Sequence, residues 1–245
     1  MKRTAHRGIV IDKGARDFEA ALLGTSFNAQ DPGRRPDQIV QANDVEEVIG
    51  AVKRARDEGL TIGICSGGHS WAQNHIRDGG MLVDLSRLNS IAINAGQGTA
   101  VIGPGCLAGE LNAALVKHKL FFPVAHAYTV GMGGFLLQGG FGWSSRACGV
   151  ACQSVIGIDV VLADGTLVHA SETENAELLW AARGAGPGQP VRGRTRPGRG
   201  GAPQQPANRA GHSAASPARR RSEPPAGHRR TSRRAAHRHH NGRER

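Results

Sequence analysis

The sequence predicts an α+β fold for its first 188 residues, followed by a disordered tail. An amphipathic helix between two short apolar segments indicates a β-α-β unit over residues 38–65. Short strands with no helix between them indicate a β-rich layer over residues 81–103. After Gly188 the large apolar residues all but disappear. A chain of 245 residues is long enough for one large domain.

Charge is divided unevenly along the chain. From Gly188 to the end there are 15 Arg, no Lys and two acidic residues, a net charge of +13. The first 187 residues carry 16 basic and 18 acidic side chains, a net charge of −2, so no basic partner surface is indicated on the folded part. With a single Val as its only large apolar residue, the tail cannot offset a backbone entropy of roughly 1–2 kcal/mol per residue.

The chain shows no sign of a disulfide framework, a metal site or a membrane segment. Cys65, Cys106, Cys148 and Cys152 form no C-x-x-C pair, and we interpret them as buried free thiols. The N-terminus has no apolar stretch typical of a signal peptide, and no apolar run approaches the length of about 18 residues that suggests a transmembrane helix. We therefore expect a cytoplasmic protein with no membrane partner.

The first expected elements lead up to the β-α-β unit. Residues 1–35 are weakly patterned and are predicted to be an N-terminal extension. The clearest helix covers residues 44–58, because its apolar residues recur at helical spacing. Asn43 is its expected N-cap, with Glu46 three residues later, and Gly59 follows its end. The other expected elements of this part are a strand at 9–11, a helical turn at 17–23, and strands at 36–42 and 61–65.

The later elements follow from the same patterns. Lys117, His118 and Lys119 stand where a helix dipole favours positive charge, at the end of a predicted helix. Ala-Asp-Gly-Thr at 163–166 is a hairpin turn. The expected elements are strands at 81–85, 90–94 and 99–103, a helix at 107–118, strands at 154–162 and 167–170, and a helix at 175–182.

Two glycine-rich stretches carry the strongest functional signal. The first, at 61–70, ends in Cys-Ser-Gly-Gly-His-Ser, and the second is Thr-Val-Gly-Met-Gly-Gly-Phe-Leu-Leu-Gln-Gly-Gly-Phe-Gly-Trp at 129–143. Glycines let a backbone approach a ligand closely and adopt positive φ. Two such loops in one domain suggest a cradle whose N–H groups bind the phosphates of an extended anionic cofactor. Turns and bulges also use glycine, so either loop alone is weak evidence.

Residues 36–188 resemble the FAD-linked oxidases of the vanillyl-alcohol-oxidase and p-cresol-methylhydroxylase (PCMH) type, and most closely the berberine-bridge-enzyme-like oxidoreductases. Seven segments occur in the family's order. They are Arg-Pro-Asp-Gln-Ile-Val at 35–40, Cys-Ser-Gly-Gly-His-Ser at 65–70, Gly-Met-Leu-Val-Asp-Leu-Ser at 80–86, Thr-Val-Gly-Met-Gly-Gly at 129–134, Gly-Gly-Phe-Gly-Trp at 139–143, Val-Val-Leu-Ala-Asp-Gly at 160–165 and Leu-Trp-Ala-Ala-Arg-Gly at 179–184.

The resemblance implies a PCMH-type FAD-binding module of two α/β subdomains, with FAD between them. His69 matches the histidine that many members bond to the flavin 8α-methyl group. The position of a second, cysteinyl flavin bond in some members corresponds to Ala127, after His126, so a single covalent bond through His69 is expected. The other residues that match the family's flavin-binding loops are Ser66, Gly67, Gly68, Ser70, Thr129, Val130, Gly131, Gly133, Gly134, Gly139, Gly140 and Gly142.

The chain departs from the family after Gly188. The family's module ends with a further strand and continues into a substrate domain, and neither pattern is found here. Residues 189–245 have the composition that GC-rich coding sequence gives in a wrong reading frame, which suggests a frameshift near Gly188. We therefore expect the FAD-binding part of an oxidoreductase, with little turnover alone.

The family's reaction passes a hydride from a small organic substrate to flavin N5, usually with dioxygen as the final acceptor. The family's catalytic base usually comes from the substrate domain, so no catalytic residue is assigned. Asp159, Asp164 and Glu110 are interpreted as surface or turn carboxylates. The alternative function is a non-catalytic protein whose Arg-rich tail binds nucleic acid or another polyanion without reading its sequence. The tail has no aromatic residue to stack on bases, which weakens this alternative.

Overall fold

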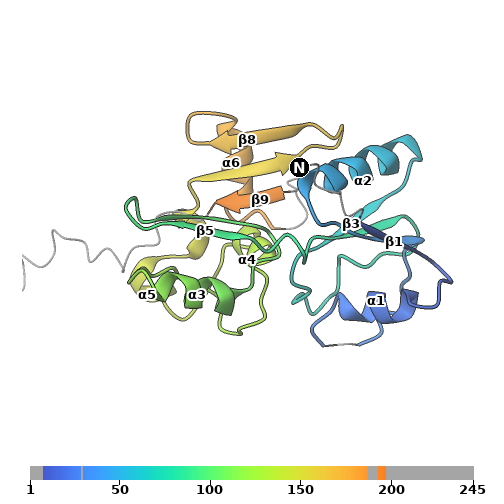
Figure 1. The fold of residues 1–245 in the computed structure, drawn as a ribbon, viewed down its shortest axis with the longest axis horizontal. Helices are drawn as coiled ribbons and strands as arrows, with labels where there is room; N and C mark the ends of the chain where they lie inside the picture. The colour runs from blue at the N-terminus through green and yellow to red at the C-terminus, as the bar shows by residue number, and fades with distance from the viewer. Residues whose placement is uncertain (1–7, 29, 187–192, 197–245) are drawn as a thin grey trace, which may run out of the picture. The chain divides into compact units, whose positions relative to one another are not determined.

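A computed structural model describes residues 8–28, 30–186 and 193–196 of the chain, and these residues form two β-sheets (Figure 1). The four-stranded sheet has the order β1-β2-β4-β3, and the five-stranded sheet has the order β5-β6-β9-β7-β8. The strands are β1 (Ile9–Asp12), β2 (Gln38–Gln41), β3 (Ile62–Cys65), β4 (Met81–Asp84), β5 (Ile91–Asn94), β6 (Thr99–Ile102), β7 (Gly157–Val161), β8 (Leu167–Ser171) and β9 (Gly193–Arg196).

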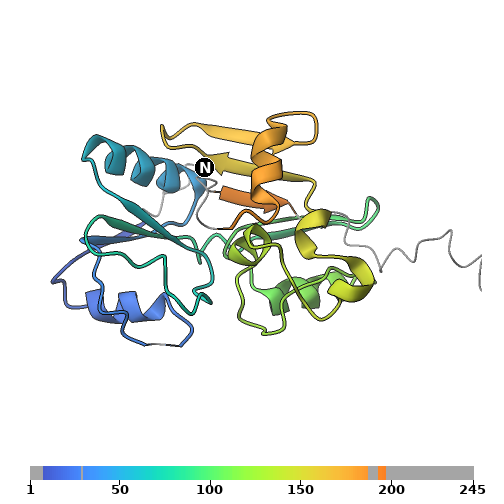
Figure 2. The same cartoon turned by 180° about the vertical axis from the view of Figure 1, so that it is seen from behind.

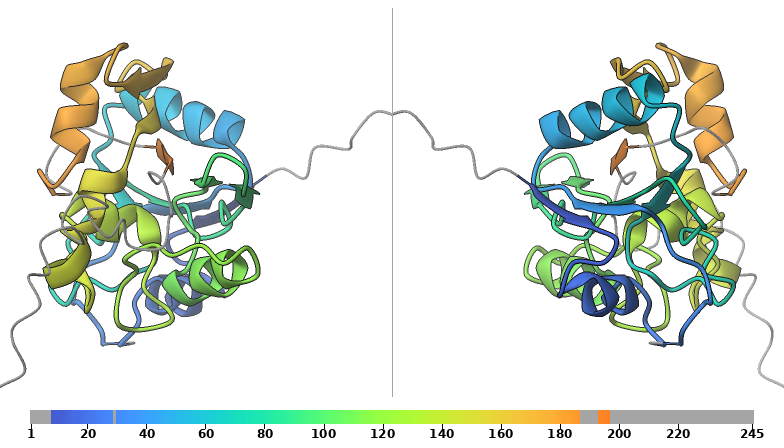
Figure 3. Two further views of the ribbon diagram at one scale, coloured as in Figure 1. Left: turned by 90° about the vertical axis from the view of Figure 1, so that its left-hand side faces the viewer. Right: turned by 90° about the vertical axis from the view of Figure 1, so that its right-hand side faces the viewer.

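The four-stranded sheet is covered by a helix on each face (Figures 1 and 3). Helix α1 (Phe18–Gly24) buries Phe18 in a cluster with Ile39 of β2. Helix α2 (Val45–Asp57) buries Val48 in a second cluster with Val40 of the same strand. Neighbouring residues of a strand point to opposite faces of the sheet, so Ile39 packs on the side of α1 and Val40 on the side of α2. The predicted N-terminal extension is therefore part of this layer, since β1 pairs with β2 and α1 covers the sheet.

Strand β4 lies between β2 and β3 and is parallel to both, with Met81 opposite Gln38 on one side and Ile62 on the other. The expected β-α-β unit is present, but its two strands are not neighbours. The assignment of residues 81–85 to a β-rich layer with 90–103 was wrong. The short spacing excluded a helical crossover, but an irregular crossover at 66–80 connects parallel strands equally well. All four residues of β4 are buried, as expected for a central parallel strand.

The N-cap of α2 is Asp44, one residue after the predicted Asn43. The Asp44 carboxylate accepts a hydrogen bond of 2.9 Å from the Glu47 N–H, and the Glu47 carboxylate accepts one of 2.6 Å from the Asn43 N–H. Each acid thus satisfies one amide donor before or within the first turn. The expected end is confirmed, because Gly59 follows the helix with φ +67°.

Replacing this cap should cost stability at one position and not at its neighbour. We expect Asp44→Ala to lower the free energy of unfolding by about 1 kcal/mol, because it leaves a helix N–H without an acceptor. Asn43→Ala is the matched control and should cost less, since within the described part of the chain the Asn43 side chain accepts a single exposed hydrogen bond, of 3.3 Å from Arg87. Urea unfolding measures both. Equal losses of unfolding free energy in the two variants would show that Asp44 is not the N-cap.

One face of the five-stranded sheet carries the main apolar core, which buries Ile102, Leu111, Met132, Ile158 and Leu179. Figure 2 shows α6 lying over the β7 and β8 strands on this side. The helices of this half are α3 (Ala108–Val116), α4 (Met132–Leu137), α5 (Ser145–Cys148), the 3-10 turn η1 (Ala151–Ser154) and α6 (Ala176–Ala182). Helices α4 and α5 were not predicted.

Strand β9 differs from the expectation that no strand follows Gly188. It lies between β6 and β7 and is antiparallel to both, with Thr195 opposite Ile102 and Ile158. Strand pairing satisfies backbone N–H and C=O groups and does not require apolar side chains, so composition could not predict it. Residues 189–192 and 197–245 of the expected tail lie outside the described residues. The polyanion-binding alternative depends on that tail and therefore stays a prediction.

The thiol and membrane expectations can be compared with the described residues. All four cysteines are free; Cys65, Cys106 and Cys152 are buried as predicted, whereas Cys148 is half-buried. Within the described part of the chain, no helix is long and apolar enough to cross a membrane.

Candidate functional site

The two glycine-rich stretches meet, although about 60 residues of sequence separate them. His69 Nε2 lies 2.8 Å from Thr129 Oγ1. Gly67 and Gly131 touch backbone to backbone, since a Cβ atom built on Gly131 would lie 2.6 Å from the Gly67 nitrogen. The prediction that the two loops form one site is consistent with this convergence, which brings together residues that follow β3 and residues that precede α4.

Backbone hydrogen bonds hold the second loop in place beside α3. The Ala108 N–H donates to the Val130 carbonyl at 2.9 Å, and the Met132 N–H donates to the Cys106 carbonyl at 2.8 Å. The Pro104 carbonyl then joins the loops, because it accepts from Ser66 Oγ at 2.5 Å and from the Gly133 N–H at 3.0 Å. A shift of either loop would therefore disturb the other.

Several backbone N–H groups of the first loop lack a hydrogen-bond acceptor in the described part of the chain. The N–H groups of Ser66, Gly67, His69 and Ser70 have no acceptor among the residues that the structure describes. Gly68 interrupts this run with φ +64°, a conformation that favours glycine. A series of amide donors around such a turn is the arrangement that binds phosphate oxygens, so the first loop fits the predicted role.

The predicted glycines of the second stretch differ in their surroundings. A Cβ atom on Gly134 or Gly139 would meet nothing within 4 Å among the described residues, so both backbones border open space. A Cβ atom on Gly140 would lie 2.6 Å from Ala151 Cβ, and one on Gly142 would lie 2.5 Å from the Val124 carbonyl oxygen. Packing therefore explains Gly142, and packing together with a φ of +72° explains Gly140.

Helix α4 was not predicted from the sequence because of its glycine content. Met132 and Leu136, four residues apart, are buried in the main core, and this spacing is the helical signal that the glycine content obscured. The helix places Gly133 against Pro104, where a Cβ atom would lie 2.8 Å from the carbonyl oxygen. The second glycine stretch is thus part loop and part helix.

The ring of His69 has contacts on its face as well as its edge. Phe27 stacks on it with ring centroids 4.5 Å apart and an interplanar angle of 10°. Trp71 meets Phe27 edge-on at 5.0 Å. Partial burial lowers the pKa of His69, and the backbone of Thr129 opposes this shift. Sequence reasoning missed Phe27 because it lies in the weakly patterned N-terminal segment.

His126 and the three carboxylates considered earlier have local partners. The His126 ring meets Trp143 edge-on with centroids 4.3 Å apart. Glu110 accepts a hydrogen bond from the Leu107 N–H, Asp164 accepts one from the Thr166 N–H, and Asp159 pairs with His169. These contacts agree with the structural interpretation of the carboxylates and do not indicate a catalytic base.

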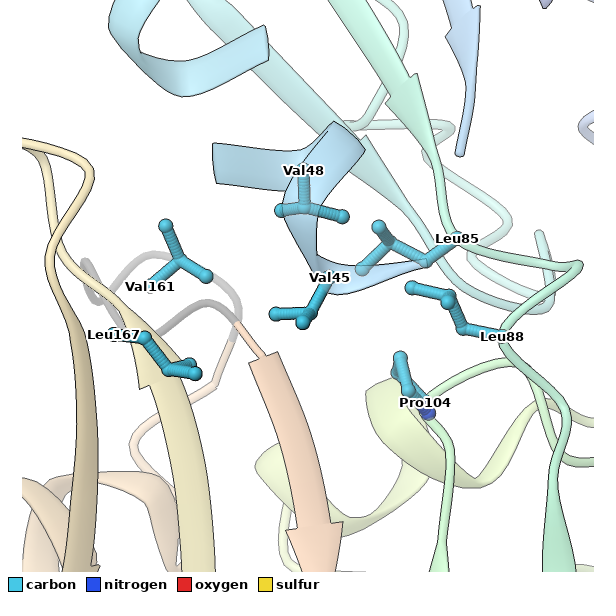
Figure 4. Close-up of a pocket in the computed structure, with 7 residues that line it drawn as sticks. All are labelled: Val45, Val48, Leu85, Leu88, Pro104, Val161 and Leu167. Atoms are coloured by element: carbon cyan, nitrogen blue, oxygen red, sulfur yellow. The ribbon is translucent and has the colours of Figure 1, made fainter. Parts of the chain in front are cut away.

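An apolar pocket adjoins the site on the other side of Pro104 (Figure 4). It has about 290 Å³ of empty space, part of it open to solvent. None of the described residues that line it has a polar side chain, so they offer nothing to a pyrophosphate or a ribityl chain. The lining residues are Val45, Val48, Leu85, Leu88, Pro104, Val161 and Leu167.

A buried histidine contacts the turn against which the first loop packs. His75 is 9% exposed, and its Nε2 lies 3.4 Å from the hydroxyl oxygens of both Thr25 and Ser26. The Thr25 carbonyl in turn packs against Gly68, leaving no room for a Cβ atom there. Burial lowers the pKa of His75 from its ordinary value of 6.5; Arg34 adds to this shift, whereas the Thr25 backbone and Asp84 oppose it.

This histidine should make the fold sensitive to mild acid. Because the pKa of His75 is lower in the folded chain, the unfolded chain binds more protons near pH 6.5, and stability is lost as pH falls from there towards the folded value. We expect His75→Gln to flatten the fall in the urea midpoint between about pH 7 and pH 5. His118→Gln, at an exposed position, should keep the wild-type slope. An unchanged slope in His75→Gln would contradict this account.

Comparisons with known proteins agree with this geometry. The model of a family described as "FAD binding domain" matches residues 36–171. The FAD-linked oxidoreductase nodO of Hypoxylon pulicicidum is 43% identical over 177 residues, which are 72% of this chain and 39% of that protein. These matches confirm the resemblance to FAD-linked oxidases.

Two solved structures are similar in fold. 6-Hydroxy-D-nicotine oxidase from Arthrobacter nicotinovorans has a TM-score of 0.72 and 32% identity, over 78% of this chain and 42% of that one. Glucooligosaccharide oxidase from Acremonium strictum, described with a 6-S-cysteinyl, 8α-N1-histidyl FAD, has a TM-score of 0.72 and 30% identity, over 80% and 41%. The chain spans about two fifths of the length of these relatives.

Proposed function

We propose that the two converging loops of this chain, which belongs to the FAD binding domain family, hold FAD, and that the chain is the FAD-binding part of a small-molecule oxidoreductase. The free amide groups of the first loop, set against the second loop, are the observation that carries this proposal. When bound, FAD would accept a hydride at N5, and dioxygen could reoxidise the reduced flavin.

The proposed cofactor contacts divide between the loops. The N–H groups of Ser66, Gly67 and Ser70 face no acceptor of the described chain and are proposed to bind phosphate oxygens. Gly134 and Gly139 border open space, which supports close approach of the cofactor there. The remaining proposed residues frame these contacts: Gly68, His69, Thr129, Val130, Gly131, Gly133, Gly140 and Gly142.

His69 is the proposed covalent attachment point. Its Nε2 is engaged by Thr129, which leaves Nδ1 as the nitrogen available to the flavin 8α carbon. Partial burial favours the neutral ring, the form that has a lone pair to give. The histidyl FAD described for glucooligosaccharide oxidase supports this proposal by analogy.

The substrate is proposed only as a small organic molecule. The similar proteins include oxidases named for an oligosaccharide and for 6-hydroxynicotine, which differ too much in chemistry to single out one class. Among the described residues we assign no catalytic base, because the carboxylates considered have structural partners.

The visible absorbance spectrum of the purified 245-residue chain, produced with FAD available, tests the proposal. A flavin spectrum that remains after gel filtration is expected. A colourless chain that also fails to quench the fluorescence of added FAD, while showing a cooperative unfolding transition, would refute it.

A further inference from the structure

His69 is held by two side chains from opposite parts of the sequence. Phe27 stacks on the ring face at 4.5 Å, and Thr129 Oγ1 lies 2.8 Å from Nε2 at the ring edge. Phe27 stands outside residues 36–171, the segment that the family model matches. The aromatic contact therefore joins the N-terminal segment to His69, which lies within the matched residues.

The position of Phe27 is fixed by its own backbone. The Phe27 N–H donates to the Gly68 carbonyl at 3.2 Å, which ties it to the residue just before His69. The preceding turn is anchored by Thr25 Oγ1, which donates to the Leu22 carbonyl at 2.7 Å at the end of α1. Trp71 then packs edge-on against the Phe27 ring. The Phe27 ring and the His69 loop must therefore move together.

Thr129 is the hydrogen-bond partner of His69 Nε2, so the role its hydroxyl takes bears on which ring nitrogen carries the proton. A neutral imidazole has one N–H and one lone pair, and the group bonded to one nitrogen decides the tautomer. If Nε2–H donates to Thr129 Oγ1, the lone pair is on Nδ1. A hydroxyl can also donate, so Thr129 can serve Nε2 after that nitrogen has lost its proton.

We propose that Phe27 and Thr129 are positioning residues for flavin attachment: Phe27 fixes the plane of the His69 ring, and Thr129 fixes the tautomer that presents Nδ1. This inference rests on the proposed function, in which His69 is the attachment point. Holding a nucleophile in the right plane and protonation state is the kind of positioning that changes rates by orders of magnitude.

The attachment step balances with dioxygen as the oxidant. A bond forms between Nδ1 and the flavin 8α carbon, and one C–H bond of that carbon breaks. Its proton and the Nε2 proton are released. The electron pair of the C–H bond passes by way of the flavin ring to dioxygen, which takes up two protons to give hydrogen peroxide.

The test follows attachment and cofactor affinity separately in the 245-residue chain. Flavin-free protein is mixed with FAD in air, samples are precipitated with acid over time, and flavin in the pellet gives the attachment rate. Fluorescence quenching at early times gives the dissociation constant of FAD. We expect Thr129→Val to slow attachment about tenfold or more and Phe27→Leu to slow it several-fold, and each variant to weaken FAD binding by a clearly smaller factor.

Conservative variants guard against simple misfolding. Thr129→Ser keeps the hydroxyl and Phe27→Tyr keeps the stacked ring, so both should attach flavin at near wild-type rates. Trp180→Leu removes an aromatic residue that is 75% exposed on α6 and is the matched control for loss of an exposed ring. NMR of the isolated flavin peptide identifies the attached nitrogen, and Thr129→Val should yield some Nε2 product where wild type yields Nδ1 alone.

The outcomes separate the two proposals. If wild type takes up no FAD, the proposed function fails and this inference fails with it. If wild type binds FAD without covalent attachment, the proposed attachment at His69 and the positioning roles are overturned, while the proposed FAD binding stands. If Thr129→Val and Phe27→Leu attach FAD through Nδ1 at the wild-type rate, only the positioning roles are overturned. A loss of rate matched by an equal loss of FAD affinity would also overturn them.

Discussion

The His69→Ala variant is expected to leave no flavin in the acid-precipitated protein, whereas the wild-type pellet stays yellow. The alanine removes the only proposed nucleophile while leaving the amide donors of the loop, which are backbone groups, in place. FAD should therefore still bind, and its colour should appear in the supernatant after precipitation. The measurement is the flavin absorbance of pellet and supernatant from equal amounts of protein.

Cys65 and Cys106 are poor competitors for this bond. Burial raises the pKa of the Cys65 thiol far above its ordinary range and raises that of Cys106 to about 12, so neither offers a thiolate near neutral pH. His126→Ala is the matched control, because it removes an exposed histidine near the second loop and should leave the pellet yellow. A yellow pellet from His69→Ala would show that another residue holds the flavin.

The element types were predictable where one period dominates the pattern. Helix α2 shows its buried positions, Val48, Val52 and Ala55, at helical spacing, and only its cap was displaced by one residue. Strand β4 was recognised as a strand but placed in the wrong sheet. The run of apolar residues in β4 indicates a strand that is buried on both faces. Which strands it pairs with depends on the irregular crossover before it, and that segment has no periodic pattern.

The candidate site was predictable to the extent that glycine indicates it. Gly67 and Gly131 stood out in the sequence, and their contact explains both. Phe27 and His75 did not stand out, because each acts through a partner distant in sequence: Phe27 on the ring of His69, and His75 on the turn at Thr25. Contacts of this kind become visible only when the chain is folded.

The Gly131→Ala variant should destabilise the chain by about 2–3 kcal/mol and weaken FAD binding at least tenfold. Gly131 has φ −71° and ψ 128°, which any residue can adopt, so its requirement is for space and not for an unusual backbone conformation. The new methyl group would lie 2.6 Å from both the nitrogen and the Cα of Gly67. Backbone atoms cannot yield as a flexible side chain can, so the two loops must separate.

Gly134→Ala tests the same substitution three residues later, in the first turn of α4. Its methyl group would meet nothing within 4 Å among the described residues, and alanine is the better helix former, so stability should stay equal or rise by up to about 1 kcal/mol. Urea unfolding without FAD measures both variants, and fluorescence quenching then measures their FAD affinity. If FAD approaches the backbone at Gly134, that variant should bind it more weakly at unchanged stability. Equal stability of the Gly131→Ala and Gly134→Ala variants would mean that the loops are not pressed together as the structure shows.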